Sequence, residues 1–142
     1  MPRPRKCRRV GRPPAFVRFK PQGIPFRSLR KVTLSLDEFE AIRLADHEGL
    51  EHASAAERMN ISRPTFTRLI ETARRKLAQA IVEGAALVIE GGAVDVEGDF
   101  CRCPRCGGVR EHRHGGHRER CGYCGTEHEC NDTKPITEEE RS

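Results

Sequence analysis

The chain has 142 residues, a formal net charge of +5 and 33% charged residues, with no Trp and a single Tyr. This length suffices for one or two small domains, and the scarcity of aromatic residues argues against one large hydrophobic core. No apolar run approaches the ~20 residues needed to cross a membrane, and the N-terminus lacks an apolar signal segment, so we expect no membrane association and a cytoplasmic location.

Basic residues dominate the first 31 residues, where no Asp or Glu interrupts them. We interpret residues 1–31 as a basic N-terminal arm, with a short strand or apolar anchor at Phe16, Val17 and Phe19. Such an arm suits the phosphate backbone or the minor groove of DNA, whether it is ordered or disordered before binding. The arm residues expected to contact DNA are Arg3, Arg5, Lys6, Arg8 and Arg9.

Helical signals begin at Ser35, which forms a Ser-x-x-Glu capping box with Glu38. Phe39, Ile42 and Ala45 then recur at helical spacing and supply a face that can pack on a following pair of helices. The sequence thus predicts the first helix of a three-helix unit spanning residues 32–90.

A helix, a short turn and a second, basic helix are predicted between Glu51 and Ala80. Small and larger apolar residues line one face of the first helix, and a continuous apolar stripe follows the second. Asn60 occupies the reversal, where a left-handed backbone is usual. The stripe residues are Ala55, Ala56 and Met59, then Phe66, Leu69, Ile70, Ala73 and Leu77.

The second helix of this pair has the layout of a DNA recognition helix. Ser62 is a good N-cap, and Pro64 falls within the first turn, where its missing N–H loses no helical bond. We expect the outward face to read bases through Ser62, Arg63, Thr67 and Arg68 and to contact phosphates through Arg74, Arg75 and Lys76. The alternative is an ordinary helical hairpin with a solvated charged face.

Past the long helix, Gly84 suits a helix end, and residues 85–90 read as a short strand or a helix extension. Gly91 and Gly92 begin a predicted linker, residues 91–100, in which residues 94–96 alternate like a strand. This apolar stretch suits either a homodimer seam or a cover for the helical core.

Four segments of the first two-thirds of the chain carry a family resemblance: RPRKCRRV at 3–10, FKPQGIP at 19–25, LDEFEAIRLAD at 36–46 and ISRPTFTRLIETARRKLAQAI at 61–81. Together they resemble an uncharacterised prokaryotic family of predicted DNA-binding proteins, and the central part is similar to region four of bacterial sigma factors. The resemblance implies a sigma-like three-helix DNA-binding domain and a role in transcription. The sequence departs from that pattern at Asn60, where Gly is usual.

Two Cys-x-x-Cys knuckles, each followed by Gly, give the sharpest chemical signal. Cys103, Cys106, Cys121 and Cys124 predict a tetrahedral four-sulfur site in a zinc-ribbon-like module, residues 101–130. Zn2+ is the expected metal, and iron or an iron–sulfur centre is the alternative. With seven Cys in an intracellular chain, metal binding is favoured over disulfides.

Other ligand types surround the knuckles without a clear spacing. A second site from Cys101, Cys130 and His128 is weakly specified by the sequence, and the remaining histidines of that segment are interpreted as solvated. Residues 131–142 are interpreted as a disordered acidic tail.

These patterns predict a mainly α fold, with a three-helix helix-turn-helix domain followed by a small zinc ribbon that has four cysteine ligands. The expected function is a nucleoid-associated, DNA-binding transcriptional regulator with double-stranded DNA as its partner. Two alternatives stay open: a metal-dependent adaptor for proteins of the transcription machinery, and a metal- or redox-sensing regulator. No catalytic motif is visible, so an enzyme is not expected.

Overall fold

The computed structural model describes the chain except for residues 1–6, 93, 97, 99, 112–117 and 130–142. The chain divides into two compact units, Met1–Glu97 and Gly98–Ser142. The division falls within residues 91–100, the range interpreted as a linker, although Val94–Val96 of that range form a strand of the first unit.

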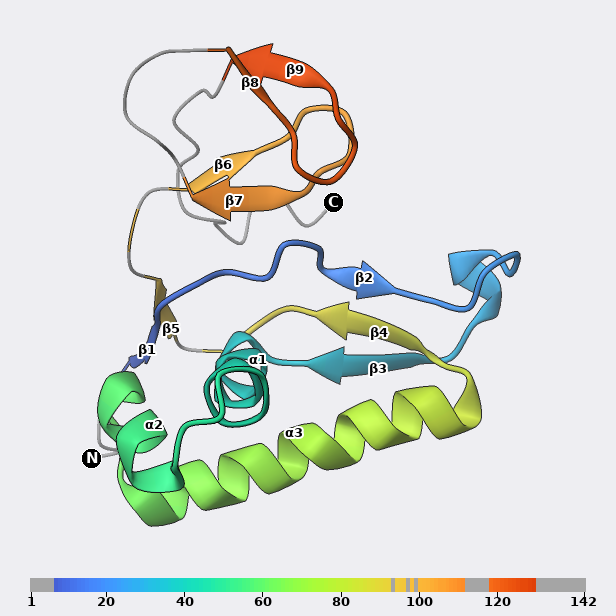
Figure 1. Ribbon diagram of the computed structural model, residues 1–142. Helices are drawn as coiled ribbons and strands as arrows, with labels where there is room; N and C mark the ends of the chain where they lie inside the picture. The colour runs from blue at the N-terminus through green and yellow to red at the C-terminus, as the bar shows by residue number, and fades with distance from the viewer. Residues whose placement is uncertain (1–6, 93, 97, 99, 112–117, 130–142) are drawn as a thin grey trace, which may run out of the picture. The chain divides into compact units, whose positions relative to one another are not determined.

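The main helices of the first unit follow one another in the chain between residues 34 and 86, where two strands of one sheet end and begin (Figure 1). The helix α1 begins after Ser35, whose Oγ accepts a hydrogen bond from the Glu38 backbone N–H at 3.4 Å. It continues into a π-helical turn, which no sequence pattern predicted. In chain order the helical elements are the 3-10 turn η1 (Phe26–Ser28), α1 (Leu36–Ile42), the π-helical turn η2 (Arg43–His47), α2 (His52–Met59) and α3 (Arg63–Glu83).

The reversal between α2 and α3 occurs at Asn60, which adopts the left-handed conformation with φ 57° and ψ 44°. Ser62 caps α3, since its Oγ accepts a hydrogen bond from the Thr65 backbone N–H at 3.3 Å. Gly84 ends the helix with φ 65°. Local signals therefore set both ends of α3 where the sequence predicts them.

Strands of the first unit form two small sheets. β4 (Ala86–Ile89) is the central strand of the larger sheet, antiparallel to β2 (Arg18–Phe19) and parallel to β3 (Lys31–Leu34). β1 (Arg8–Val10) pairs in parallel with β5 (Val94–Val96). The prediction of a mainly α fold is thus confirmed only for the helices, because parts of the basic arm and of residues 85–96 pair as strands around them.

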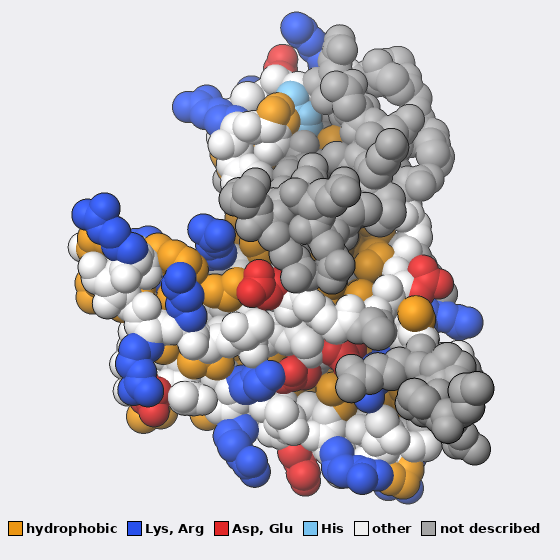
Figure 2. Space-filling view, turned by 180° about the vertical axis from the view of Figure 1, so that it is seen from behind, with side chains coloured by type: hydrophobic (Ala, Val, Ile, Leu, Met, Phe, Trp, Pro, Cys, Tyr) orange, Lys and Arg blue, Asp and Glu red, His pale blue; other side chains and the backbone are white. Residues whose placement is uncertain are grey.

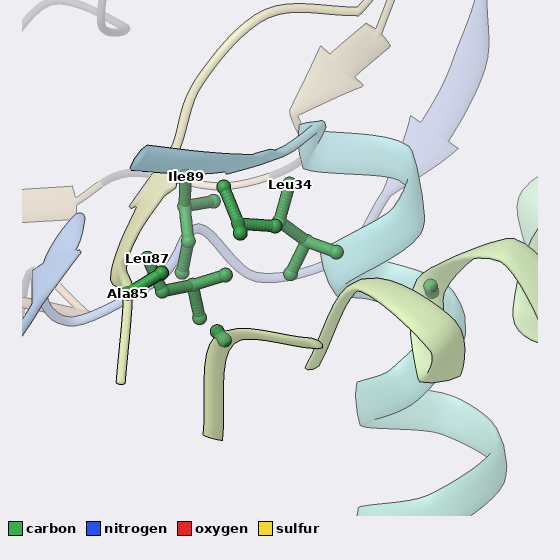
Figure 3. Close-up of a cluster of buried hydrophobic side chains, with 7 residues drawn as sticks. Leu34, Ala85, Leu87 and Ile89 are labelled. Carbon is green, nitrogen blue, oxygen red and sulfur yellow. The ribbon is translucent and has the colours of Figure 1, made fainter. Parts of the chain in front are cut away.

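A hydrophobic core joins the larger sheet to α3, which runs along one face of it (Figure 1). Leu34, Leu87 and Ile89 extend from β3 and β4 (Figure 3), and Ala73 and Ala80 of α3 complete the cluster. The small side chains on α3 let the helix approach the sheet closely. This core fixes the long helix against the sheet along its C-terminal half.

A second core lies within the helix-turn-helix itself. Phe66, Ile70 and Met59 are fully buried, and the small residues Ala55 and Ala56 let α2 cross close to α3. Burial of a Phe or Ile side chain stabilises a fold by about 1.5–3 kcal/mol each. The N-terminal half of α3 is consequently held in a fixed rotation about its axis.

The second unit contains two short antiparallel hairpins. Each hairpin turns at a Cys-x-x-Cys knuckle. The four strands are β6 (Phe100–Arg102), β7 (Val109–Glu111), β8 (Arg118–Arg120) and β9 (Glu127–Glu129). No helix in the described part of the chain combines the length and the apolar character that a membrane span requires.

Candidate functional site

The first turns of α3 present a polar surface opposite the buried core. Phe66 is fully buried, while Ser62, Arg63 and Arg68 are exposed. Neither arginine forms an ion pair with a carboxylate within the described residues. Thr67 is half-buried, and its Oγ1 lies 3.1 Å from His52 Nδ1 on α2. The residues predicted to read bases therefore share the N-terminal end of α3, with Thr67 held in place by α2.

His52 of α2 also belongs to this surface, although no sequence motif singled it out. Its ring also packs edge-on against Phe66, with the ring centroids 5.3 Å apart. His52 thus links the buried anchor of α3 to a polar residue at its surface. Its position opposite Thr67, one helix away, is a tertiary relationship that no local pattern reveals.

Two of the three cations predicted to contact phosphates from the middle of α3 are held by carboxylates of other elements. Arg74 donates two hydrogen bonds to Asp46, at 3.1 and 2.7 Å. These bonds lower the pKa of the Asp46 carboxyl and raise the pKa of the Arg74 guanidinium. Lys76 Nζ lies 2.7 Å from Glu38 Oε1. Arg75 is exposed and pairs with no carboxylate in the part of the chain that is described.

The described end of the basic arm is tied to α1 by an ion pair and a hydrogen bond. Arg8 Nη1 lies 2.5 Å from Asp37 Oδ2, and the Gly11 backbone N–H donates to Glu40 Oε1 at 3.2 Å. Arg9 is exposed. Arg3, Arg5 and Lys6 lie outside the described residues.

Buried acids on α1 are the group of charged residues that sequence reasoning missed. Asp37, Glu38 and Glu40 are all buried, and each pairs with a cation from a different element or from the following turn. One sequence feature could have indicated this pairing: α1 contains three acidic residues, whereas the basic arm, residues 1–31, contains none. Their placement means that part of the positive charge of the arm and of α3 is already neutralised inside the unit.

Four cysteine sulfurs meet between the two hairpins of the second unit. The Sγ atoms of Cys103, Cys106, Cys121 and Cys124 all lie within 4.8 Å of one another. The Sγ–Sγ distance is 3.8 Å for Cys103 and Cys124 and 3.6 Å for Cys106 and Cys121. Four sulfurs at about 2.3 Å from a central ion in a tetrahedron would be about 3.8 Å apart, so the arrangement fits one metal ion.

The two knuckles repeat the same backbone pattern. Gly107 N–H donates to the Cys103 carbonyl oxygen and Gly125 N–H donates to the Cys121 carbonyl oxygen, both at 2.9 Å. Both glycines have a positive φ, 74° and 76°, which explains the Gly after each second Cys. The turn directs both sulfurs of each Cys-x-x-Cys pair to the same point.

Hydrogen bonds to the sulfurs favour thiolates at two of the four cysteines. The Thr126 hydroxyl, and then the Thr126 backbone N–H, lower the pKa of the exposed Cys124 thiol to about 6. Backbone N–H groups of Cys124 and Tyr123 lower the pKa of Cys121. The Gly108 N–H also lowers the pKa of Cys106, but burial and hydrogen bonds with the other three sulfurs outweigh it and raise that pKa to about 12.

Arg105 Nη1 donates to Thr126 Oγ1 at 3.2 Å, and the Cys124 thiol donates to the same oxygen at 3.4 Å. Once the thiol has lost its proton, the Thr126 hydroxyl can donate to the sulfur instead. The site can therefore supply negative charge to a cation.

Other Cys and His residues do not join this group among the residues that are described. Cys101 and His128 are buried in the second unit, and Cys7 in the first unit is exposed. Cys101 is disulfide-bonded, so the weakly specified metal site that included it is not supported, and the expectation of metal binding rather than disulfides is wrong for this cysteine. Cys130, the third member of the weakly specified second site, lies outside the described residues, as do His112, His114 and His117.

Comparison with known proteins places the chain in a family. Residues 1–97 match the family model described as "Protein of unknown function DUF134". A UPF0251 protein of Chloroherpeton thalassium is 52% identical over 127 residues, covering 89% of this chain and 84% of the relative. One from Moorella thermoacetica is 49% identical, covering 89% and 85%. One from Rhodospirillum rubrum is 61% identical over 89 residues, covering 63% and 62%.

No solved structure matches the chain significantly. The family match spans the whole first unit, with its helix-turn-helix and both small sheets, while the first two relatives align with most of the chain. The chain belongs to the DUF134/UPF0251 family of uncharacterised bacterial proteins.

Proposed function

We propose that this protein is a DNA-binding transcriptional regulator that reads duplex DNA with the N-terminal end of α3. The observation that carries the proposal is the rotation of this helix: Phe66 is buried, and Arg63 and Arg68 are exposed on the outside. Because neither arginine pairs with a carboxylate among the described residues, both guanidinium groups are available. Arginine donates two hydrogen bonds to the major-groove edge of guanine, which is the commonest specific contact in protein–DNA complexes.

The spacing of the two arginines suits base pairs about two steps apart. Arg63 begins the first turn of α3 and Arg68 lies in the second turn, about 7.5 Å farther along the helix axis at the normal rise per residue, and successive base pairs are about 3.4 Å apart. Thr67 lies between them, and its methyl group is the part that could contact a thymine methyl, since its hydroxyl contacts His52.

Phosphate contacts come from cations that are not already paired. Arg75 is the exposed candidate on α3, and the positive end of the α3 dipole adds to the attraction for phosphate. Arg74 and Lys76 can serve only if DNA displaces Asp46 and Glu38. We therefore assign most of the affinity from α3 to Arg63, Arg68 and Arg75.

We further infer that the four cysteines hold one Zn2+. All four sulfurs lie within 4.8 Å of one another, whereas an iron–sulfur cluster binds its thiolates through different iron atoms and so needs them farther apart. A single iron ion would fit the same tetrahedron, and absorption distinguishes it because zinc is colourless. Zinc would hold the two hairpins together, because short hairpins of this kind have little apolar area of their own.

Selection of bound fragments from a genomic DNA library, using full-length metal-loaded protein, tests the DNA-reading proposal. We expect a recurrent sequence among bound fragments. On that sequence Arg68→Ala should lower affinity by about 5–150-fold, equivalent to 1–3 kcal/mol, and should lower affinity for random duplex much less.

Arg58→Ala is the matched control, because it removes the same charge from an exposed arginine of α2 that is not among the residues expected to contact DNA. Equal losses on selected and random duplex for Arg68→Ala would contradict base reading. Absence of any duplex binding at physiological salt would instead favour an adaptor that binds proteins of the transcription machinery.

A further inference from the structure

A second cationic surface surrounds Phe26, between β2 and β3. The Arg18 guanidinium carbon and Lys31 Nζ each lie 4.7 Å from the centroid of the Phe26 ring. We name this surface the Phe26 patch. It consists of Arg18, Lys20, Phe26, Arg27, Arg30 and Lys31.

Strand register places two cations of the patch, Arg18 and Lys31, on the face of the sheet that is turned away from α3. Arg18 is paired with Val88 and Lys31 with Ala86, and directly paired residues point to the same face. The alternate residues Leu87 and Ile89 point to the opposite face, where they pack in the core with α3. The two cations therefore stand on the outer face, with the ring of Phe26 between them.

The charge of the patch is unbalanced. None of its five cationic side chains pairs with a carboxylate within the described residues, whereas Arg8, Arg43, Arg58, Arg74 and Lys76 all do. Lys20 Nζ contacts only backbone carbonyl oxygens, at 2.8 Å for Ile24 and 3.4 Å for Pro21. A concentration of exposed, unpaired cations favours an anionic partner.

The Phe26 patch lies far from the N-terminal end of α3, where Arg63 and Arg68 are exposed. The helix contains 21 residues, which corresponds to about 30 Å of length. Lys31 is paired with Ala86, which follows the C-terminal end of α3, while Arg63 is at the N-terminal end. Figure 2 shows Lys and Arg side chains around hydrophobic surface on the first unit. The patch is thus a separate surface.

Apolar groups beside the cations distinguish the kind of anion. Ile24 is 42% exposed in the turn that follows β2. Phe19 is paired with Leu87 and so points to the α3 face of the sheet, outside the patch. The Arg18 guanidinium lies over the Phe26 ring, 4.7 Å from its centroid, and its other side can take a nucleobase, since guanidinium planes stack on bases. Duplex DNA would leave these groups facing phosphates, because its own bases are stacked inside. Unstacked bases of a single strand can cover them.

We propose that the Phe26 patch binds single-stranded nucleic acid, with the phosphates on Arg27, Arg30 and Lys31 and a base against the Arg18 guanidinium. Cations that follow the backbone together with stacking surfaces are the usual basis of sequence-tolerant single-strand binding. This surface acts independently of the reading end of α3. A result that contradicts duplex binding by α3 would therefore not contradict single-strand binding by the patch.

Fluorescence anisotropy with a labelled oligothymidine of about 12 nucleotides and full-length zinc-loaded protein tests the proposal. We expect the double variant Arg18→Ala/Lys31→Ala to weaken binding by about tenfold or more and to reduce the log–log salt slope by about 0.7 for each phosphate that is no longer neutralised. Arg18→Lys keeps the charge but removes the planar group, so it should also weaken binding. Arg58→Ala is the matched control, since Arg58 is an exposed arginine of α2 outside both proposed binding surfaces, and it should bind the oligonucleotide as the wild type does.

Competition identifies the partner. Unlabelled single strand should displace the label at a much lower concentration than unlabelled duplex of equal nucleotide content. Equal displacement by duplex, unchanged binding in the double variant, or equal weakening in Arg58→Ala would each overturn the proposal. Thermal unfolding of each variant, matched to that of the wild type, shows that weaker binding does not reflect impaired folding. A failure of the duplex proposal leaves these oligonucleotide results unaffected.

Discussion

Arg74 and Asp46 form a two-point ion pair, 2.7 and 3.1 Å long, that ties the middle of α3 to the π-helical turn η2. The pair neutralises one cation on the exposed face of α3. It also holds α3 against the turn that precedes α2. The positive charge that α3 exposes thus depends on residues far from it in sequence.

Removing this carboxylate should increase general affinity for DNA. We expect Asp46→Ala to raise affinity for random duplex by about twofold to fivefold and to steepen the log–log salt slope by about 0.9, since Arg74 becomes free to neutralise one more phosphate. Gel shifts over a range of salt concentrations measure both. Glu83→Ala changes the net charge equally at the far end of α3 and serves as the control; an equal rise in that variant would assign the effect to net charge alone.

The same pair gives stability an acid dependence of known sign. Because Arg74 lowers the pKa of Asp46 in the folded protein, the stabilisation is present above the unfolded pKa and is lost as pH falls through the lowered folded pKa. The pair is exposed, so the contribution is about 0.5 kcal/mol or less. Urea unfolding of the wild type and Asp46→Ala should converge between about pH 5 and pH 3. A difference that grows on acidification would contradict the assignment.

Glu40 and Glu48 both bind Arg43, but they differ in burial. The Glu40 side chain is 2% exposed and the Glu48 side chain is 37% exposed. Glu40→Ala should lower the free energy of unfolding by about 3–5 kcal/mol, because it leaves Arg43 partly buried without its main partner and removes the acceptor of Gly11 N–H. Glu48→Ala, the matched control, should cost about 1 kcal/mol or less. Equal costs in urea titrations would show that burial of Glu40 contributes nothing.

Backbone conformation at Asn60 predicts the order of three variants. With φ at 57°, Asn60→Gly should be as stable as the wild type or slightly more so, while Asn60→Ala should lose about 1 kcal/mol and Asn60→Val more than that. Thermal unfolding measures the order. The Ala and Gly variants both remove the Asn side chain, so a similar loss in both would point to the side chain rather than to the backbone.

Metal removal should expose one cysteine to alkylation before the others. In chelator-treated protein, Cys124 should react first with iodoacetamide near pH 7, because its thiol is exposed and its pKa is about 6. Thr126→Val should slow that reaction by removing the hydroxyl that lowers this pKa. Peptide mass mapping over time gives the order, and preferential alkylation of Cys121 would contradict it.

Metal binding itself should weaken as pH falls, because protons compete with the ion for the four thiolates. Metal analysis of the purified protein should give one ion per chain, and Cys121→Ser should lower that content. Cys7→Ser is the matched control, since Cys7 lies outside the four-sulfur group. Full metal content in Cys121→Ser would argue against the site.

Local signals predicted the helices well. Ser35, Asn60, Ser62 and Gly84 each act on the backbone within a few residues of themselves, so caps and turns could be located from sequence alone. The spacing of Cys103, Cys106, Cys121 and Cys124 likewise predicted a four-sulfur group, because a knuckle is a short-range geometry.

Pairings between distant segments could not be predicted in the same way. Arg8 lies beside Val94 in the β1–β5 ladder, although 85 residues lie between them in the chain. Arg74 and Lys76 looked available to phosphate because the sequence does not reveal that Asp46 and Glu38 reach them. The basic arm was left open between order and disorder, and its strands depend on partners that follow α3. These relationships arise only once the cores have formed.

The parallel pairing of β1 with β5 closes the first unit on itself. The earliest and the latest strands of that unit share one ladder, and the family match, residues 1–97, spans both. A deletion before Val10, which removes β1, and a deletion after Ile89, which removes β5, would therefore disrupt the same strand pair. A shortened version of this protein must therefore keep both β1 and β5, whereas an exchange of sequence beyond residue 97 leaves the pairing of these two strands intact.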